Sequence, residues 1–112
     1  MTTASNQPRV PLAERNEVPV EVAILYDKLQ ADRGVVPNMF KTVANTPALA
    51  LGFAGLSKPL LCDGALPRWY KELVATRMSV LQGSHYAVTA HSISARQKGG
   101  ARGAHCCGQG RL

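Results

Sequence analysis

The stretch RWYKELVATRMSVLQGSHYAVTAHSISARQK, residues 68–98, predicts two helices that are separated by a short break. Pro67 stands where a first helix would begin, and Gly83 stands where it would end. Ser84 then offers the side-chain oxygen that a second helix needs at its N-cap. The stretch therefore predicts an antiparallel helical hairpin. One side of the first helix holds Trp69, Leu73, Thr76 and Val80.

Three further helices are predicted upstream of this hairpin. The first begins at Pro19, ends at Gly34 and carries an apolar stripe of Val22, Leu25, Tyr26 and Leu29. A short helix follows from Pro37, with Met39, Phe40 and Val43 on its buried side. The third begins at Pro47 after the N-cap Thr46, and Pro59 is expected to end or kink it. Its apolar stripe is Leu49, Phe53, Leu56 and Leu60.

The chain as a whole is predicted to be all-α, with about five helices and no sheet. No segment of its 112 residues shows strict alternation of apolar and polar residues over a strand's length. Residues 1–18 carry prolines and scattered charges and are expected to form an extended arm. Residues 19–98 form the predicted helical domain, and residues 99–112 form a Gly-rich basic tail that is expected to be disordered.

The tail carries most of the net charge of +6. Residues 1–95 hold nine Lys/Arg against seven Asp/Glu, whereas residues 96–112 hold four Lys/Arg and no acid. A short basic tail gives only unspecific attraction to phosphates, so no specific nucleic-acid partner is expected. Two interpretations of the tail stay open. It is a natural disordered segment, or it is the out-of-frame product of a GC-rich gene that truncates the helical bundle.

Neither membrane insertion nor export is expected. No apolar run approaches the roughly 20 residues of a membrane span, and the N-terminus lacks the apolar core of a signal peptide. A cytoplasmic location is therefore the default expectation. The three cysteines, Cys62, Cys106 and Cys107, form neither a zinc-binding pattern nor a disulfide framework. No metal or cofactor is expected.

Four residues of the hairpin are candidates for chemistry: Glu72, Ser84, Tyr86 and His91. Ser84 and His91 are seven residues apart, so they point within about 20° of each other on a helix. An antiparallel hairpin can bring Glu72 opposite His91. A carboxylate beside an imidazole orients the ring, and the histidine can then give or take a proton near neutral pH. Tyr86 could hydrogen-bond a substrate.

Each candidate also has a purely structural interpretation, and spacing alone does not choose between the two. A lone histidine on a helix face is usually a core residue with one hydrogen bond. A glutamate inside a helix is usually solvated or paired with a basic neighbour, which here would be Lys71. Ser84 is first of all an N-cap, and Cys62 reads as a small buried apolar residue.

Two segments together resemble the carboxymuconolactone decarboxylase and alkylhydroperoxidase D-like superfamily. They are RGVVPNMFKTVANTPALALGFAGLSKPLL, residues 33–61, and LPRWYKELVATRMSVLQGSHYAVTAHSISARQKG, residues 66–99. The family pattern is a Glu, a Cys twelve residues on, a second Cys three further on and a His four beyond that. Here this spacing falls on Glu72, Ser84, Ala87 and His91. The resemblance implies an all-α bundle over roughly residues 9–99 and association into a homo-oligomer.

The resemblance also implies what chemistry this chain lacks. The peroxidase branch reduces hydroperoxides through two cysteines, and Ser84 and Ala87 stand in their places. A serine hydroxyl is too weakly acidic to replace a thiolate, and alanine offers no sulfur. The decarboxylase branch does not need the cysteines. It implies a small unsaturated or lactone carboxylic acid as substrate, with a Glu72–His91 proton relay.

Two alternatives to a decarboxylase remain at this point. One is a peroxidase-related protein that lacks the cysteine pair and uses another thiol, such as Cys62. The other is a truncated, non-catalytic remnant, which the Gly-rich end suggests. Relatives of this kind continue beyond the His-bearing helix with further helices, so the bundle is expected to be incomplete.

Overall fold

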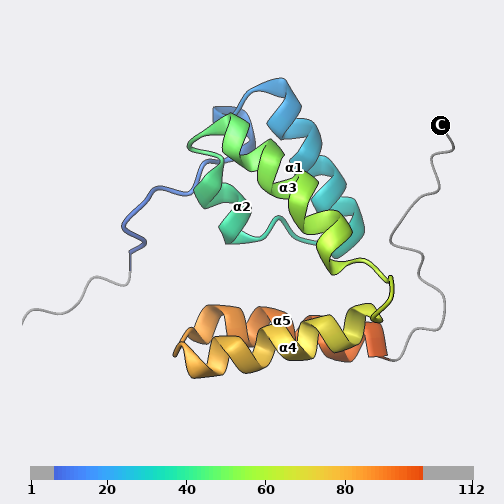
Figure 1. The fold of residues 1–112 in the computed structure, drawn as a ribbon. Helices are drawn as coiled ribbons and strands as arrows, with labels where there is room; N and C mark the ends of the chain where they lie inside the picture. Colours follow the sequence, from blue (N-terminus) through green and yellow to red (C-terminus); the bar gives the residue numbers. More distant parts are fainter. Residues whose placement is uncertain (1–6, 100–112) are drawn as a thin grey trace, which may run out of the picture. The chain divides into compact units, whose positions relative to one another are not determined.

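The computed structural model describes residues 7–99, and all the regular secondary structure within that range is helical (Figure 1). No strand occurs among these residues, so the predicted all-α class with five helices is confirmed. A 3₁₀ helix, η1, precedes the five α helices. The elements are η1 Arg15–Glu17, α1 Val20–Arg33, α2 Asn38–Val43, α3 Pro47–Leu61, α4 Arg68–Leu81 and α5 His85–Gly99.

The segment that was expected to be an extended arm contains this η1 turn. A capping box closes it, because the backbone N–H of Glu14 donates to Glu17 Oε2 at 2.8 Å while Glu14 accepts from the turn. The segment is also anchored by Ala13, whose N–H donates to Lys41 O at 3.0 Å. The predicted Gly-rich tail lies outside the described residues except for Gly99, the last residue of α5. Its disorder and the frameshift interpretation therefore stay predictions.

Prolines mark the beginnings of the helices, but in three cases the helix begins one residue later than the sequence predicted. Pro19, Pro37 and Pro67 are N-caps with ψ between 140° and 158°, which is extended backbone. Proline fixes φ but leaves ψ free, so it serves before the first turn as well as within it. Pro47 is the first residue of α3, as predicted.

Pro59 lies inside α3, which continues to Leu61. Of the two alternatives predicted for Pro59, the first, that it ends the helix, is therefore wrong. Proline removes one backbone donor, and this close to the C-terminus of a helix few further hydrogen bonds depend on it. Three members of the apolar stripe of α3 are not buried, since Leu49, Leu56 and Leu60 are each more than half exposed.

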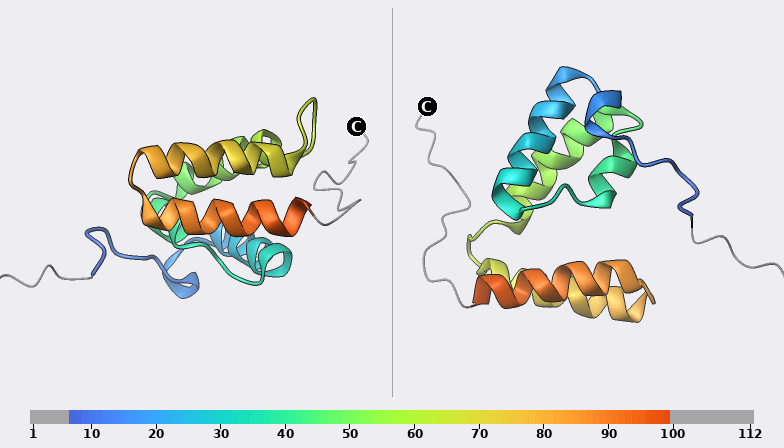
Figure 2. Two further views of the ribbon diagram at one scale, coloured as in Figure 1. Left: turned by 90° about the horizontal axis from the view of Figure 1, so that it is seen from below. Right: turned by 180° about the vertical axis from the view of Figure 1, so that it is seen from behind.

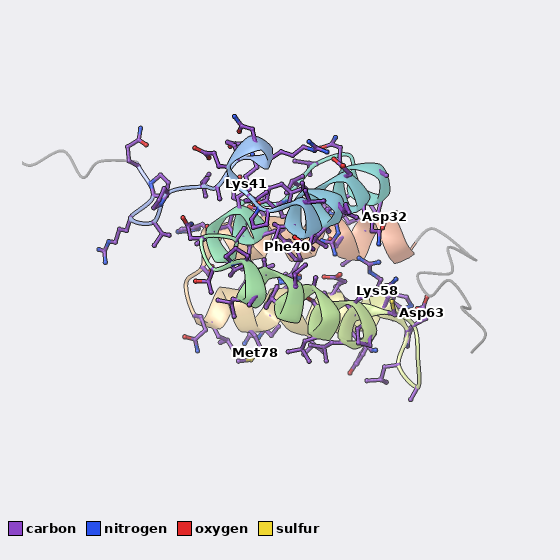
Figure 3. All side chains as sticks on the ribbon, turned by 90° about the horizontal axis from the view of Figure 1, so that it is seen from above. Asp32, Phe40, Lys41, Lys58, Asp63 and Met78 are labelled. Atoms are coloured by element: carbon purple, nitrogen blue, oxygen red, sulfur yellow. The ribbon has the colours of Figure 1, made fainter. Side chains whose placement is uncertain are left out.

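The chain forms two compact units that divide between Leu56 and Ser57. The core of the first unit joins residues from the N-terminal segment, α1, α2 and the start of α3. Phe40, labelled in Figure 3, lies in this core, and its ring meets that of Phe53 edge to face at a centroid distance of 5.6 Å. The buried residues of the core are Ala13, Val22, Tyr26, Leu29, Phe40, Ala44 and Ala50.

A buried polar bond also ties the N-terminal segment to this core. Tyr26 is 2% exposed, and its hydroxyl donates to the backbone oxygen of Ala13 at 2.9 Å. Because a buried acceptor without a partner is costly, replacing Tyr26 with phenylalanine is expected to lower the free energy of unfolding by about 0.5–1.5 kcal/mol. Urea unfolding at neutral pH measures this loss.

The burial of Tyr26 also makes the stability of the fold depend on pH in the alkaline range. Burial raises the pKa of Tyr26 above its ordinary 10.0, because the phenolate would have to be desolvated. A raised pKa in the folded state contributes stability that is complete below pH 10 and is lost as pH rises through the folded value. The Tyr26→Phe variant should therefore lose less stability than the wild type above pH 10. Tyr70→Phe, at a residue 44% exposed, is the matched control and should keep the wild-type alkaline loss.

The second unit is a helical hairpin in which α4 and α5 run antiparallel, side by side (Figure 2). Its turn combines two motifs. Gly83 adopts φ 68° and donates to Val80 O at 3.1 Å, while Ser84 N–H donates to Ser79 O at 3.0 Å. These two bonds form a Schellman motif, which requires the left-handed conformation that glycine adopts freely. Ser84, the residue directly after this turn, is the N-cap of α5, since its Oγ accepts from Ala87 N–H at 3.4 Å.

The buried face of α4 is polar, and its apolar face is exposed. Arg68, Glu72 and Ser79 are buried. The stripe that the sequence places on one side of α4 is not part of this buried face, because Trp69, Leu73 and Val80 are between 42% and 51% exposed. Met78, labelled in Figure 3, belongs to the same exposed set and is 52% exposed. Periodicity identifies the faces of a helix, but it does not tell which face a neighbouring helix covers.

No helix within residues 7–99 combines the length and the apolar character that crossing a membrane requires.

Candidate active site on the helical hairpin

The hairpin brings Glu72 of α4 and His91 of α5 into direct contact. Glu72 Oε2 lies 2.7 Å from His91 Nδ1, although the two residues are nineteen apart in the sequence. The Glu72 side chain is 2% exposed and that of His91 is 31% exposed. The carboxylate is therefore enclosed, while part of the imidazole remains accessible to solvent or to a small molecule.

The direction of this hydrogen bond follows from the chemistry of the two groups. An ionised carboxylate has lone pairs but no hydrogen, so it can only accept. His91 must then donate through Nδ1–H, and the carboxylate fixes both the ring and its tautomer. The nitrogen left for proton exchange is Nε2, which is a base in the neutral ring and an acid in the imidazolium.

A third residue, Arg68, completes the arrangement from one turn earlier on α4. Its Nε lies 3.5 Å from Glu72 Oε1, and its side chain is 10% exposed. The two carboxylate oxygens of Glu72 are thus divided between a guanidinium and an imidazole. Sequence reasoning missed Arg68, although its spacing of four residues from Glu72 is the usual signal for an ion pair on one helix face.

Local backbone contacts fix the start of α4, where Arg68 lies. Asp63 Oδ1 accepts from Arg68 N–H at 2.7 Å and so satisfies one of the free donors at the helix N-terminus. Lys71 Nζ donates to the carbonyl oxygens of Cys62 at 2.7 Å and Leu60 at 3.0 Å, which ties α4 to the end of α3. Lys71 thus binds backbone carbonyl groups at the end of α3, and the structural interpretation that paired it with Glu72 is not supported.

The other two predicted site residues lie elsewhere on α5. Ser84 is two turns before His91, about 10 Å away along the helix axis at 1.5 Å per residue. Tyr86 is 52% exposed, and five helical residues place it about 140° around the axis from His91. The structure therefore brings Glu72 and His91 together but does not bring Ser84 or Tyr86 to them.

Cys62 and His85 lie apart from this site. Cys62 is 2% exposed, which fits a small buried side chain, since a reactive thiol needs an open approach. His85 is exposed in the first turn of α5. Within the described part of the chain, no three His, Cys, Asp or Glu side chains gather in a group that could hold a metal ion.

The hairpin defines an all-helical protein whose chemistry-bearing residues are a buried carboxylate and a partly exposed imidazole on adjacent helices. The sequence profile of the Carboxymuconolactone decarboxylase family matches residues 47–104, slightly more than half of the chain and the whole of this hairpin. The chain belongs to that family. Comparisons with curated proteins and with solved structures gave no match.

Proposed function

We propose that the chain is a decarboxylase-like lyase that acts on a small unsaturated or lactone carboxylic acid. The observation that carries this proposal is the 2.7 Å contact between the buried Glu72 carboxylate and His91 Nδ1. It leaves His91 Nε2 as the group that delivers a proton. Membership of the carboxymuconolactone decarboxylase family supports the class of substrate.

The proposed step is a loss of carbon dioxide followed by protonation. The bond between the substrate carbon and its carboxylate breaks, and carbon dioxide leaves. The electron pair spreads into the unsaturated lactone as an extended enolate. The imidazolium Nε2–H of His91 then protonates the enolate carbon. The ring that remains is neutral and keeps its proton on Nδ1, where it is hydrogen-bonded to the Glu72 carboxylate. Solvent returns a proton to Nε2, so one proton is consumed for each carbon dioxide released.

A thiol peroxidase has less support. A dithiol cycle needs sulfur at both positions of the family pattern, and they carry Ser84 and Ala87. The remaining thiol among the described residues, Cys62, is buried. No peroxide reduction is therefore part of the proposal.

Replacing Glu72 with glutamine tests the proposal. An amide of the same shape is neutral and can present its NH₂ to Nδ1, so the ring loses its fixed tautomer. With carboxymuconolactone as the probe, the rate of carbon dioxide release is expected to fall about 10²-fold, as is typical for impaired acid–base catalysis. Circular dichroism establishes that the variant is folded.

Glu21→Gln is the matched control, because Glu21 lies exposed in the first turn of α1. Its rate should equal that of the wild type. Equal rates for the wild type and Glu72→Gln would contradict the proposal. So would a wild-type protein that is folded yet releases no carbon dioxide from any unsaturated or lactone acid tested.

A further inference from the structure

We propose that Arg68 is a positioning residue, which sets the tautomer of His91 by acting through Glu72. The inference rests on the proposed function, because it assigns the support of the same proton relay. The observation behind it is the division of one carboxylate between two partners. Glu72 Oε1 faces Arg68 Nε at 3.5 Å, and Glu72 Oε2 meets His91 Nδ1 at 2.7 Å.

The ionisation of Glu72 decides which way the hydrogen bond to His91 runs. The Glu72 side chain is 2% exposed, so it has lost nearly all contact with water and depends on Arg68 and His91 for polar partners. A neutral carboxylic acid carries an O–H donor. It would donate to Nδ1 and force the ring proton onto Nε2. Nε2 would then already carry a proton and could not accept one from solvent, so the proposed proton transfer through Nε2 would be blocked.

Arg68 prevents this reversal because its guanidinium stays charged at every pH at which the protein is folded. It faces Glu72 from one turn away on the same helix, and its side chain is 10% exposed. Little solvent lies between the two charges to weaken their attraction. The backbone N–H of Arg68 donates to Asp63 Oδ1 at 2.7 Å, and this bond fixes the backbone from which the guanidinium extends.

A positioning role predicts a different kinetic effect from direct substrate binding. If Arg68 held the carboxylate of the substrate, its loss would raise KM most strongly. If it acts through Glu72, its loss lowers kcat and leaves KM nearly unchanged. For Arg68→Met, kcat is expected to fall about 10-fold, the lower end of what the loss of a supporting hydrogen-bond partner costs.

The decisive measurement is the tautomer of His91, which requires no turnover. In ¹⁵N-labelled protein at about pH 9, where an ordinary histidine is neutral, long-range ¹H–¹⁵N spectra separate protonated from unprotonated ring nitrogens. The chain has three histidines, so spectra of His91→Gln and His85→Gln assign the signals. The wild type should show His91 with a proton on Nδ1 and none on Nε2. Arg68→Met should shift it toward the Nε2–H form.

Matched variants make the test specific. Arg68→Gln, which is neutral and polar, should give the same shift as Arg68→Met and replaces it if the latter does not fold. Arg68→Lys keeps the charge and should retain the wild-type tautomer. Arg77→Met removes an exposed arginine from the same helix and should change nothing.

The outcomes separate this inference from the proposed function. An unchanged His91 tautomer in folded Arg68→Met or Arg68→Gln overturns the role of Arg68 while leaving the relay intact. An Nε2–H tautomer in the wild type itself would overturn both. A rise in KM with unchanged kcat in Arg68→Met would assign the guanidinium to substrate binding instead.

Discussion

Substitution of His91 by glutamine is expected to lower the rate of carbon dioxide release by about 10³-fold, within the range that general acid–base catalysis contributes. Glutamine preserves a polar side chain of similar reach, but it cannot carry a proton to an enolate carbon. The proposed mechanism provides no second group for this task, since Ser84 lies two turns away and Tyr86 points to another side of α5. Release of carbon dioxide from carboxymuconolactone, followed over time, gives the rate.

His85→Gln is the control for this variant, because it makes the same change at an exposed position six residues earlier on the same helix. Its rate should match the wild type. A His91→Gln protein that retains more than a tenth of the wild-type rate would show that the proton comes from another group. If His85→Gln lost activity as well, the assignment of Nε2 of His91 would fail.

The second large effect concerns stability. Replacing Glu72 with alanine is expected to lower the free energy of unfolding by about 3–5 kcal/mol, the cost of leaving one partner of a buried ion pair alone. The loss has two sources: Arg68, 10% exposed, keeps its charge without the carboxylate, and His91 loses its hydrogen-bond acceptor. A small protein has only about 5–15 kcal/mol to lose, so the hairpin of this variant should be close to unfolding.

Urea unfolding followed by tryptophan fluorescence reports directly on this unit, because the single tryptophan, Trp69, lies on α4 next to Arg68. The double variant Arg68→Met/Glu72→Leu should regain the part of the loss that comes from the unpaired Arg68, since apolar side chains replace a buried pair without a stability penalty in many proteins. The part that comes from the lost acceptor of His91 should remain. Glu21→Ala, an exposed glutamate on α1, is the control and should cost less than about 0.5 kcal/mol. A loss of that small size for Glu72→Ala would mean that the pair contributes nothing to the fold.

The sequence predicted the positions of the helices well, because the signals that mark helix ends are local. Proline, glycine and serine act on their own backbone and on neighbours within one turn. The Schellman motif at Gly83 and the N-cap at Ser84 depend on residues 78–87 alone, so they could be predicted without knowledge of the rest of the chain. The contact of Glu72 with His91 followed from the same signals, since a hairpin with a defined turn has a defined register.

The burial of helix faces could not be predicted in the same way. The α4 stripe at Trp69, Leu73 and Val80 has the spacing of a core, yet the buried face is the one next to it, about 100° around the helix axis, which holds Arg68, Glu72 and Ser79. Which face is covered depends on what packs against the helix, and that information is spread over distant residues. Arg68 was missed for a related reason. On the sequence alone an arginine next to an aromatic pair looks like a solvated charge, and only its burial marks it as part of the site.

The Schellman turn at Gly83 has a consequence for how relatives of this chain are sorted. Because the turn sets the register of α4 against α5, the arginine, the glutamate and the histidine can be written as one linear signature. It reads Arg, three residues, Glu, eighteen residues, His, which here spans Arg68 to His91. The two positions occupied by cysteine in the thiol branch fall inside this signature but are not part of it. Family members that keep the three residues and have lost both cysteines would then form a group defined by the proton path proposed for this chain rather than by a missing redox centre.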